Sequence, residues 1–262
     1  MKTYYSLQKI FLLVTGVSIL STAHIFAQDR PLKKMTLKNV RFHVGSFFDT
    51  YDNLSPEGLL SMIKGANTSG FKLSDYEEAY RYARLEGGNI GFDLVFTPTK
   101  QLYNNKVTQE IRLGASVNLA REAMIDMSKI TENENADPYY TGDFVGLCII
   151  ENEFVLQASY IFNFSIVESK WQLYVGPGAN FGSTFSNDFV FIGLSDELIP
   201  AKNSHFFRAY TTLGTSLQFN RWRVDLESIY GLGAQIVHQS DNNFMKRNRA
   251  VQLGISYQLK KS

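Results

Sequence analysis

Hydrophobic and polar residues alternate with a period of two over much of this chain, the pattern of a β-strand with one apolar and one polar face. Leu113, Ala115 and Val117, for example, alternate with Gly114 and Ser116. Comparable segments recur, and we predict eight strands, over residues 39–48, 89–97, 107–119, 144–164, 170–181, 204–219, 222–233 and 249–259. Beyond the first 27 residues, no apolar run reaches the roughly 18 residues that a membrane-spanning helix needs.

The stretch 144–164 allows two interpretations. A turn at Glu151 and Asn152 would divide it into a hairpin of two strands. Alternatively it is one long strand, because the apolar alternation keeps its phase from Cys148 to Phe164. A separate hairpin would also place long and short connections on the same side of the sheet, so we favour one strand.

The connections between the predicted strands alternate between short and long. The long ones cover about 49–87, 120–142, 182–203 and 234–248. An even number of strands places both chain ends on one side, so all long connections are expected outside and all short turns in the periplasm. The first long connection contains two predicted helices, one opened by Ser55-Pro56-Glu57 and one by the capping-box pair Ser74 and Glu77.

These features predict an all-β fold, an eight-stranded antiparallel transmembrane β-barrel with long extracellular loops and short periplasmic turns. A sheet crosses a membrane only when it closes, because closure leaves no backbone group unpaired in the hydrocarbon. A secreted β-sandwich or a lipocalin-like barrel is the alternative, but here the apolar face is large and continuous around all eight strands. Aromatic residues collect at the predicted strand ends, at the inner interface Phe164, Trp171, Phe219, Trp222 and Tyr257, and at the outer interface Phe48, Phe181, Phe206 and Tyr230.

The polar face of the predicted strands carries equal numbers of acidic and basic residues. They are Arg41, Arg112, Arg208 and Arg223, and Asp93, Glu110, Asp225 and Glu227. Unpaired buried charge is very costly, so we expect these side chains to pair inside the barrel. An eight-stranded barrel is filled by its own side chains, which argues against a wide channel and against an accessible catalytic carboxylate pair.

The first residues predict export. Lys2 and Lys9 precede a short apolar run, and small residues follow it, so 1–27 is a secretory signal peptide and 28–38 a periplasmic arm. Cleavage after Ala27 is preferred, and the small residues Ser21 and Ala23 offer a competing site. The net charge of +1 becomes −1 once the two leader lysines are lost, and nothing indicates a nucleic-acid partner.

The sequence contains few patterns that indicate a disulfide, a metal site or a cofactor. The single cysteine, Cys148, allows no internal disulfide. No metalloprotease, phosphate-loop or EF-hand pattern occurs, and we predict no cofactor and no metal site. His43 and His205 stand alone, as hydrogen-bonded fillers usually do.

The signal peptide, the asymmetry of the connections and the amphipathic last strand resemble the small outer-membrane barrels of the OmpX and OmpA-transmembrane type. The chain departs from them by ending Leu259-Lys260-Lys261-Ser262 instead of on an aromatic residue. The resemblance implies the outer membrane of a Gram-negative bacterium, contact with lipid including lipopolysaccharide, and assembly by the barrel-assembly machinery. The functions it implies are diverse, from adhesion and envelope stability to lipid modification.

One local pattern is similar to the lipid A 3-O-deacylase barrels. His238 and Ser240 match the family's His-x-Ser, in which histidine is the base for a serine nucleophile. Asp241 stands where that family has asparagine, and Gln252 occupies the region of its orienting acid. Two ordinary loop residues are therefore the alternative.

The function we expect is that of a structural or partner-binding envelope protein, acting through its extracellular loops, with a possible envelope protein as partner. The alternatives are a lipid A acyl hydrolase using His238 and Ser240, and a narrow pore.

Overall fold

The computed structural model describes residues 35–51, 55–63, 71–82, 84–98, 107–130, 144–167, 170–193, 198–232, 236–238 and 246–259. Eight long strands dominate this part of the chain: β1 (Met35–Tyr51), β3 (Arg84–Pro98), β4 (Val107–Lys129), β5 (Phe144–Val167), β6 (Trp171–Ile192), β8 (His205–Phe219), β9 (Trp222–Gly231) and β11 (Lys246–Gln258). Three shorter strands join the same sheet: β2 (Tyr76–Tyr82), β7 (Ile199–Pro200) and β10 (Ile236–His238). The helix α2 (Pro56–Ser61) and the 3-10 turn η1 (Leu73–Asp75) lie between β1 and β2. Among the described residues, no helix has the length and apolarity needed to cross a membrane.

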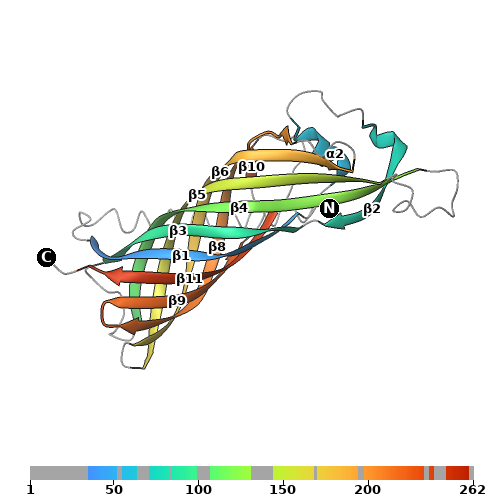
Figure 1. Ribbon diagram of the computed structural model, residues 1–262. Coiled ribbons are helices and arrows are strands. Elements are labelled where there is room, and N and C mark those ends of the chain that lie inside the picture. Colours follow the sequence, from blue (N-terminus) through green and yellow to red (C-terminus); the bar gives the residue numbers. More distant parts are fainter. Residues whose placement is uncertain are drawn as a thin grey trace, which may run out of the picture.

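The eight long strands close into a ring (Figure 1). Neighbours pair antiparallel in the order β1–β3–β4–β5–β6–β8–β9–β11, and β11 pairs in turn with β1. Such a ring has no open edge, which is the condition for a sheet to cross a membrane. The fold is therefore the predicted eight-stranded antiparallel transmembrane β-barrel.

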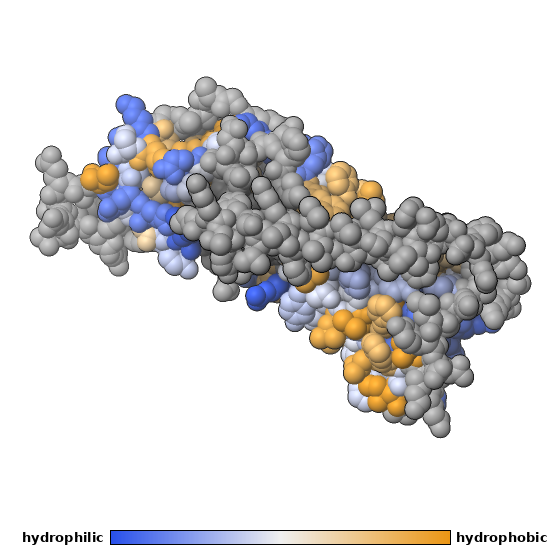
Figure 2. Space-filling view, turned by 180° about the vertical axis from the view of Figure 1, so that it is seen from behind, coloured by the Kyte–Doolittle hydropathy of each residue, from blue (hydrophilic) through white to orange (hydrophobic). Residues whose placement is uncertain are grey.

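Side chains alternate between an apolar exterior and a polar interior. On β1, Phe42 and Val44 are exposed while Arg41 and His43 are buried. Every strand of the ring contributes large exposed apolar residues, among them Phe42, Ile90, Leu113, Leu156, Leu173, Leu213, Leu226 and Leu253. Figure 2 shows hydrophobic residues on the barrel, at the lower right, and hydrophilic residues mixed with hydrophobic ones at the opposite end. In water such an exterior would aggregate, whereas in lipid it is solvated by acyl chains.

The barrel wall is much taller on one side than on the other. β9 has 10 residues and β5 has 24, whereas about 9–11 residues suffice to cross a bilayer. The ends of β4, β5 and β6 therefore continue beyond the ring, flanked by β2 on the β4 side and β7 on the β6 side. We call this five-stranded extension the projecting sheet, made of β2, residues 122–129, 144–151 and 186–192, and β7. It extends toward the upper right of Figure 1, where α2 lies.

The lumen-side face of the wall changes from polar to apolar where the projecting sheet begins. A β-bulge in β4 lies between Asn118, which pairs with Glu153, and Arg121, which pairs with Glu151. Beyond it, the lumen-side face and the connections packed on it form one apolar core: Leu59, Met62, Ile63, Phe71, Ala123, Ile125, Met127, Val145, Leu147, Ile149, Phe189, Phe191, Ile199 and Ala201. The projecting sheet is thus a folded unit with a core of its own.

Two connections far apart in sequence are tied together over this core. The backbone N–H of Lys202 donates to the carbonyl of Met62 at 2.7 Å, and Ile63 forms a β-bridge with Ala201. The ammonium group of Lys202 donates to the carbonyl of Ser61 at 2.8 Å. These bonds fix α2 and the segment around β7 on the same face.

The structure agrees with some of the local expectations and overturns others. α2 begins as predicted, with Pro56 at its first position and the Ser55 hydroxyl accepting from the Gly58 N–H at 3.1 Å. The preferred single strand over 144–164 is confirmed as β5. The helix expected after Ser74 is wrong, because η1 leads there into β2, which pairs with β4. All four long connections are partly strand: β2 lies within 49–87, β4 runs to Lys129 within 120–142, β6 runs to Ile192 within 182–203, and β10 lies within 234–248.

Candidate functional site

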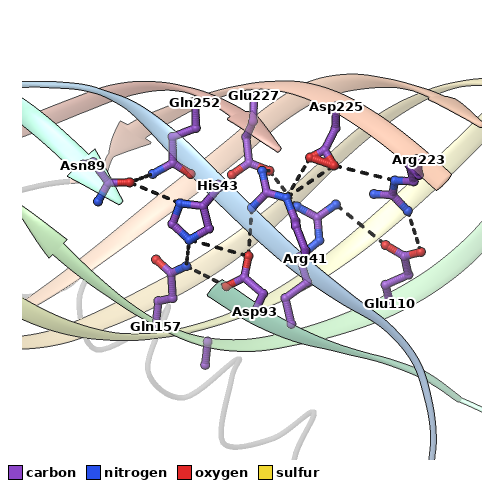
Figure 3. Close-up of polar contacts among 12 residues, drawn as sticks. Arg41, His43, Asn89, Asp93, Glu110, Gln157, Arg223, Asp225, Glu227 and Gln252 are labelled. Carbon is purple, nitrogen blue, oxygen red and sulfur yellow. Dashed lines mark hydrogen bonds and ion pairs between the residues drawn. The ribbon is translucent and has the colours of Figure 1, made fainter. Parts of the chain in front are cut away.

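The centre of the lumen is organised around Arg41 of β1 (Figure 3). Its Nη1 lies 2.8 Å from Asp93 Oδ2, its Nε 2.7 Å from Asp225 Oδ2, and its Nη2 3.4 Å from Glu227 Oε2. The side chain is 1% exposed. One guanidinium therefore neutralises carboxylates from both β3 and β9, in a place where an unpaired charge would be very unfavourable.

A second set of ion pairs continues the network. Arg112 Nη1 lies 2.6 Å from Glu227 Oε2, and Arg223 Nη1 lies 2.8 Å from Glu110 Oε1. The Tyr174 hydroxyl also donates to Glu227, at 3.0 Å. Glu227 is thus shared by three partners, and β4, β6 and β9 are connected through it.

On the other side of Arg41 the charges give way to a group of amides around His43. Nδ1 of His43 lies 3.2 Å from the Asn89 oxygen and Nε2 lies 3.2 Å from the Gln157 amide nitrogen. Gln157 donates in turn to Asp93 at 2.6 Å, and Gln252 donates to Asn89 at 2.8 Å. His43 is held as a hydrogen-bonded filler that links the charged centre to the amides.

The network ends at a further ion pair near the mouth of the barrel. Asn89 donates to Asn118 at 2.6 Å, and Asn118 donates to Glu153 at 3.0 Å. Arg208 Nη2 completes the chain at 2.8 Å from Glu153 Oε1. Hydrogen bonds and ion pairs therefore run without a break from Arg41 through the amides to Arg208.

The structure brings all eight predicted lumen charges into the barrel interior, each of them buried. Sequence reasoning missed Glu153, the partner of Arg208, and the amides Asn89, Asn118, Gln157 and Gln252. The signal was present in β5, where Glu153 shares its parity with Gln157 and Asn163 on the face opposite Phe154 and Leu156. The arrangement is that of a filled, cross-linked interior.

The aromatic side chains predicted for the inner interface lie together at one end of the barrel. Phe164, Trp171, Phe219, Trp222 and Tyr257 are all exposed there, at the ends of β5, β8 and β11 and the starts of β6 and β9. The rings of Trp222 and Tyr257 are 4.9 Å apart, and the Trp171 indole N–H donates to the Thr215 hydroxyl at 2.7 Å. Such rings suit the boundary between headgroups and acyl chains.

Phe206 was predicted at the outer interface, and this was wrong. The ring is 1% exposed and points into the barrel, where the Arg208 guanidinium lies 3.8 Å from its centroid. Phe206 pairs with Gly182 of β6, whose missing side chain leaves room for the ring. The neighbouring Phe207 is the exposed residue of this pair.

The single cysteine, Cys148, lies in the outer part of β5 and is buried. Burial raises the pKa of the Cys148 thiol to about 11, and the nearby carboxylates of Glu122 and Asp126 act in the same direction. The thiolate is the reactive form of cysteine, so Cys148 is an unreactive apolar side chain at neutral pH.

Most of the other residues and segments for which the sequence predicts a role lie outside the described part of the chain. His238 ends β10, where its backbone pairs with that of His205, but its side chain is outside the described part, as is Ser240. The predicted signal peptide and residues 28–34 of the predicted arm also fall outside it. The arm was predicted too long, because residues 35–38 belong to β1, which pairs here with β3. Within the described ranges, no three histidine, cysteine or acidic side chains are placed to hold a metal ion.

Comparisons with known proteins concern the fold. No family model and no curated protein matches the chain. Among solved structures, it is similar to the attachment invasion locus protein Ail of Yersinia pestis, at 12% identity and a TM-score of 0.34, covering 86% of this chain and 100% of that one. It is also similar to OprG of Pseudomonas aeruginosa, at 10% identity and a TM-score of 0.38, covering 87% and 98%. The N-terminal β-barrel domain of Pseudomonas aeruginosa OprF matches at 12% identity and a TM-score of 0.33, covering 86% and 100%.

The closed ring, the apolar exterior and the paired charges inside it are the features of a sheet that crosses a membrane. The chain is a transmembrane β-barrel, similar in fold to small outer-membrane barrels of the OmpX and OmpA-transmembrane type.

Proposed function

We propose that this protein is a structural or partner-binding component of the outer membrane, and that the projecting sheet is the part that meets the partner. In this proposal the leader 1–27 is removed, residues 28–34 lie in the periplasm ahead of β1, and the projecting sheet stands outside the cell. The barrel-assembly machinery inserts the chain among outer-membrane lipids, including lipopolysaccharide.

The observation that carries the proposal is the separate apolar core of the projecting sheet. Crossing the membrane does not require β2, α2 or the outer ends of β4, β5 and β6. Lys202 nevertheless ties its segment to α2 through two hydrogen bonds, and Leu59 is completely buried beneath. Long connections that are ordered without serving the scaffold are commonly functional.

The filled interior supports an anchoring role for the barrel. Arg41, Arg112 and Arg223 cross the lumen and pair with carboxylates of other strands. A solute would have to break several of these buried ion pairs to pass.

The proposal is tested by replacing residues 52–83 with a short turn. Thr50 pairs with Arg84, so β1 and β3 can be joined directly. We expect the shortened barrel to insert and to keep heat-modifiable migration on gels, but to lose partner capture or resistance of the envelope to detergent. If insertion is normal and every binding and envelope phenotype is unchanged, the proposal is wrong.

A further inference from the structure

The projecting sheet has a second face, which points away from α2 and which we call the opposite face. Its members are Tyr80 of β2, Met124 and Asp126 of β4, Gly146, Cys148 and Ile150 of β5, and Val190 and Ile192 of β6. Cross-strand pairing places them side by side, as in the pairs Met124–Cys148, Cys148–Val190 and Gly146–Ile192. Tyr80 is 56% exposed and Ile192 38%, whereas Cys148 and Asp126 between them are buried, so apolar surface meets solvent at the two margins of this face.

A single carboxyl group lies in the middle of this apolar surface. Asp126 pairs with Tyr80 on one side and with Gly146 on the other. A Cβ on Gly146 would lie 3.5 Å from Oδ1 of Asp126 and 3.2 Å from Cβ of Ile192. The carboxyl therefore packs against the backbone of Gly146, in a place where Ile192 and the Met124 sulfur also lie close.

Asp126 is buried and incompletely satisfied. The residue is 6% exposed, and among the described residues no hydrogen-bond donor reaches its Oδ1. Burial among apolar side chains disfavours the charged form and so raises the pKa of Asp126. A buried acceptor without a donor costs about 1–3 kcal/mol, and more when it is charged. The site lacks a donor that a bound partner could supply.

The charge on the opposite face has one sign. Besides Asp126, it carries the exposed residues Glu77 and Glu122, and the half-buried Asp188, which pairs with Ile150. Among the described residues of this face there is no lysine or arginine. Arg81 pairs with Ile125 and so belongs to the lumen-side face. A ligand complementary to the opposite face is therefore apolar and cationic at once.

The edges of the projecting sheet are less suited to binding. β2 has a β-bulge between Glu78 and Tyr80, and its edge carries the ion pair of Glu78 and Arg81. β7 has only two residues, one of them Pro200. Bulges, charges and proline are the devices by which edges avoid pairing with other strands.

We propose that the opposite face binds a cationic amphipathic polypeptide segment, whose apolar side covers Tyr80 and Ile192 and whose lysine or arginine donates to Asp126. This inference rests on the proposed function, for which it names the class of partner. It assigns recognition to one face, and to the carboxyl at its centre.

The test uses the mature protein in nanodiscs of zwitterionic lipid and a fluorescent amphipathic helix of leucine and lysine, with empty nanodiscs as background. Binding is followed by fluorescence anisotropy. Two further probes separate the contributions: a leucine–glutamate helix of the same pattern, and a lysine–serine peptide of the same charge. We expect only the leucine–lysine helix to bind above background.

Three variants locate the site. Asp126→Asn keeps the shape, removes a buried charge and is expected to weaken binding about tenfold or more. Ile192→Ser, at an exposed position, is expected to weaken it as well. Glu78→Gln removes one charge from a residue that pairs with Met127 of the lumen-side face, and should bind like the wild type. Heat-modifiable migration shows that each variant is folded.

The inference is overturned if the leucine–lysine helix does not exceed background, if the lysine–serine peptide binds as well, or if Asp126→Asn binds like the wild type. Failure of this test leaves the proposed function standing when replacement of residues 52–83 still removes the envelope phenotype. If that replacement has no phenotype, the proposed function fails whatever the peptide does.

Discussion

Arg41 of β1 reaches Asp225 of β9 across an intervening strand, with 2.7 Å between Nε and Oδ2. The strand between them is β11, which contributes Gly254 opposite both His43 and Asp225. A Cβ at position 254 would lie 2.1 Å from Oδ2 of Asp225 and 2.5 Å from Nε of Arg41. The central ion pair therefore depends on the absence of a side chain in the strand that closes the barrel.

Gly254→Ala is expected to destabilise the barrel by about 1–3 kcal/mol, because the new methyl group must displace the ion pair. The measurement is urea-induced unfolding in detergent micelles, followed by tryptophan fluorescence. Gly88→Ala is the matched control, since a Cβ there would have nothing within 4 Å. Equal losses of stability in the two variants would show that the central ion pair does not depend on the missing side chain at position 254.

Arg41→Met should cost more, about 3–5 kcal/mol, because it leaves buried carboxylates without their partner. Asp93 and Asp225 would lose their closest cation, and Glu227 would keep Arg112. Arg221→Met, in the exposed turn between β8 and β9, makes the same chemical change at the surface. If both variants unfold at the wild-type urea concentration, the network contributes nothing to stability.

The barrel and its charges could be predicted because both depend on local alternation. The period-two alternation predicts that Arg41 and Asp93 lie on polar faces, and closure of the sheet then brings them together. Glu153 was not predicted because the strand β5 is recognisable from its apolar side alone, and Glu153 lies on the other side. The polar partners are thus visible in sequence once each strand is read on both faces.

The projecting sheet could not be predicted, because long-range contacts create it. The bridge between Ile63 and Ala201 joins positions far apart in the chain, and no local sequence pattern predicts it. Ser74 and Glu77 do form a helix-start pattern, but pairing of β2 with β4 outweighs that weak local preference. The inward position of Phe206 likewise depends on Gly182, a residue of another strand.

Leu59→Ala is expected to loosen the projecting sheet and leave the barrel intact. Leu59 is completely buried in the apolar core, and removal of such a side chain costs about 2–5 kcal/mol. Limited proteolysis should cut the variant faster than the wild type, while heat-modifiable migration persists. Glu57→Gln, on the exposed side of the same helix, should be cut at the wild-type rate. If the Leu59→Ala variant lost both its resistance to proteolysis and its heat-modifiable migration, the projecting sheet and the barrel would not be separate units.

The ion pairs across the lumen predict a conductance near background in planar bilayers. Arg41 and Arg112 hold carboxylates of β3 and β9 within 2.8 Å, so an ion would have to displace a buried pair. The double variant Arg41→Ala, Asp93→Ala removes one such pair and should raise the conductance if it still inserts. Stable, frequent openings of the wild type would instead favour the narrow pore.

Asp126 predicts a specific dependence of stability on pH. Burial raises its pKa in the folded protein, so the folded state holds this proton more tightly than the unfolded chain does. The contribution of Asp126 to the free energy of unfolding is therefore largest below the pKa of an ordinary aspartate, and is lost as the pH rises through the raised value. Asp126→Asn removes this term and should flatten the acid side of the stability curve measured in micelles. Ser128→Ala changes a buried neighbour without removing a titrating group and should keep the wild-type shape. If the stability curve of Asp126→Asn parallels that of the wild type, the Asp126 carboxyl already has a hydrogen-bond donor in solution. It would then not need one from a bound partner.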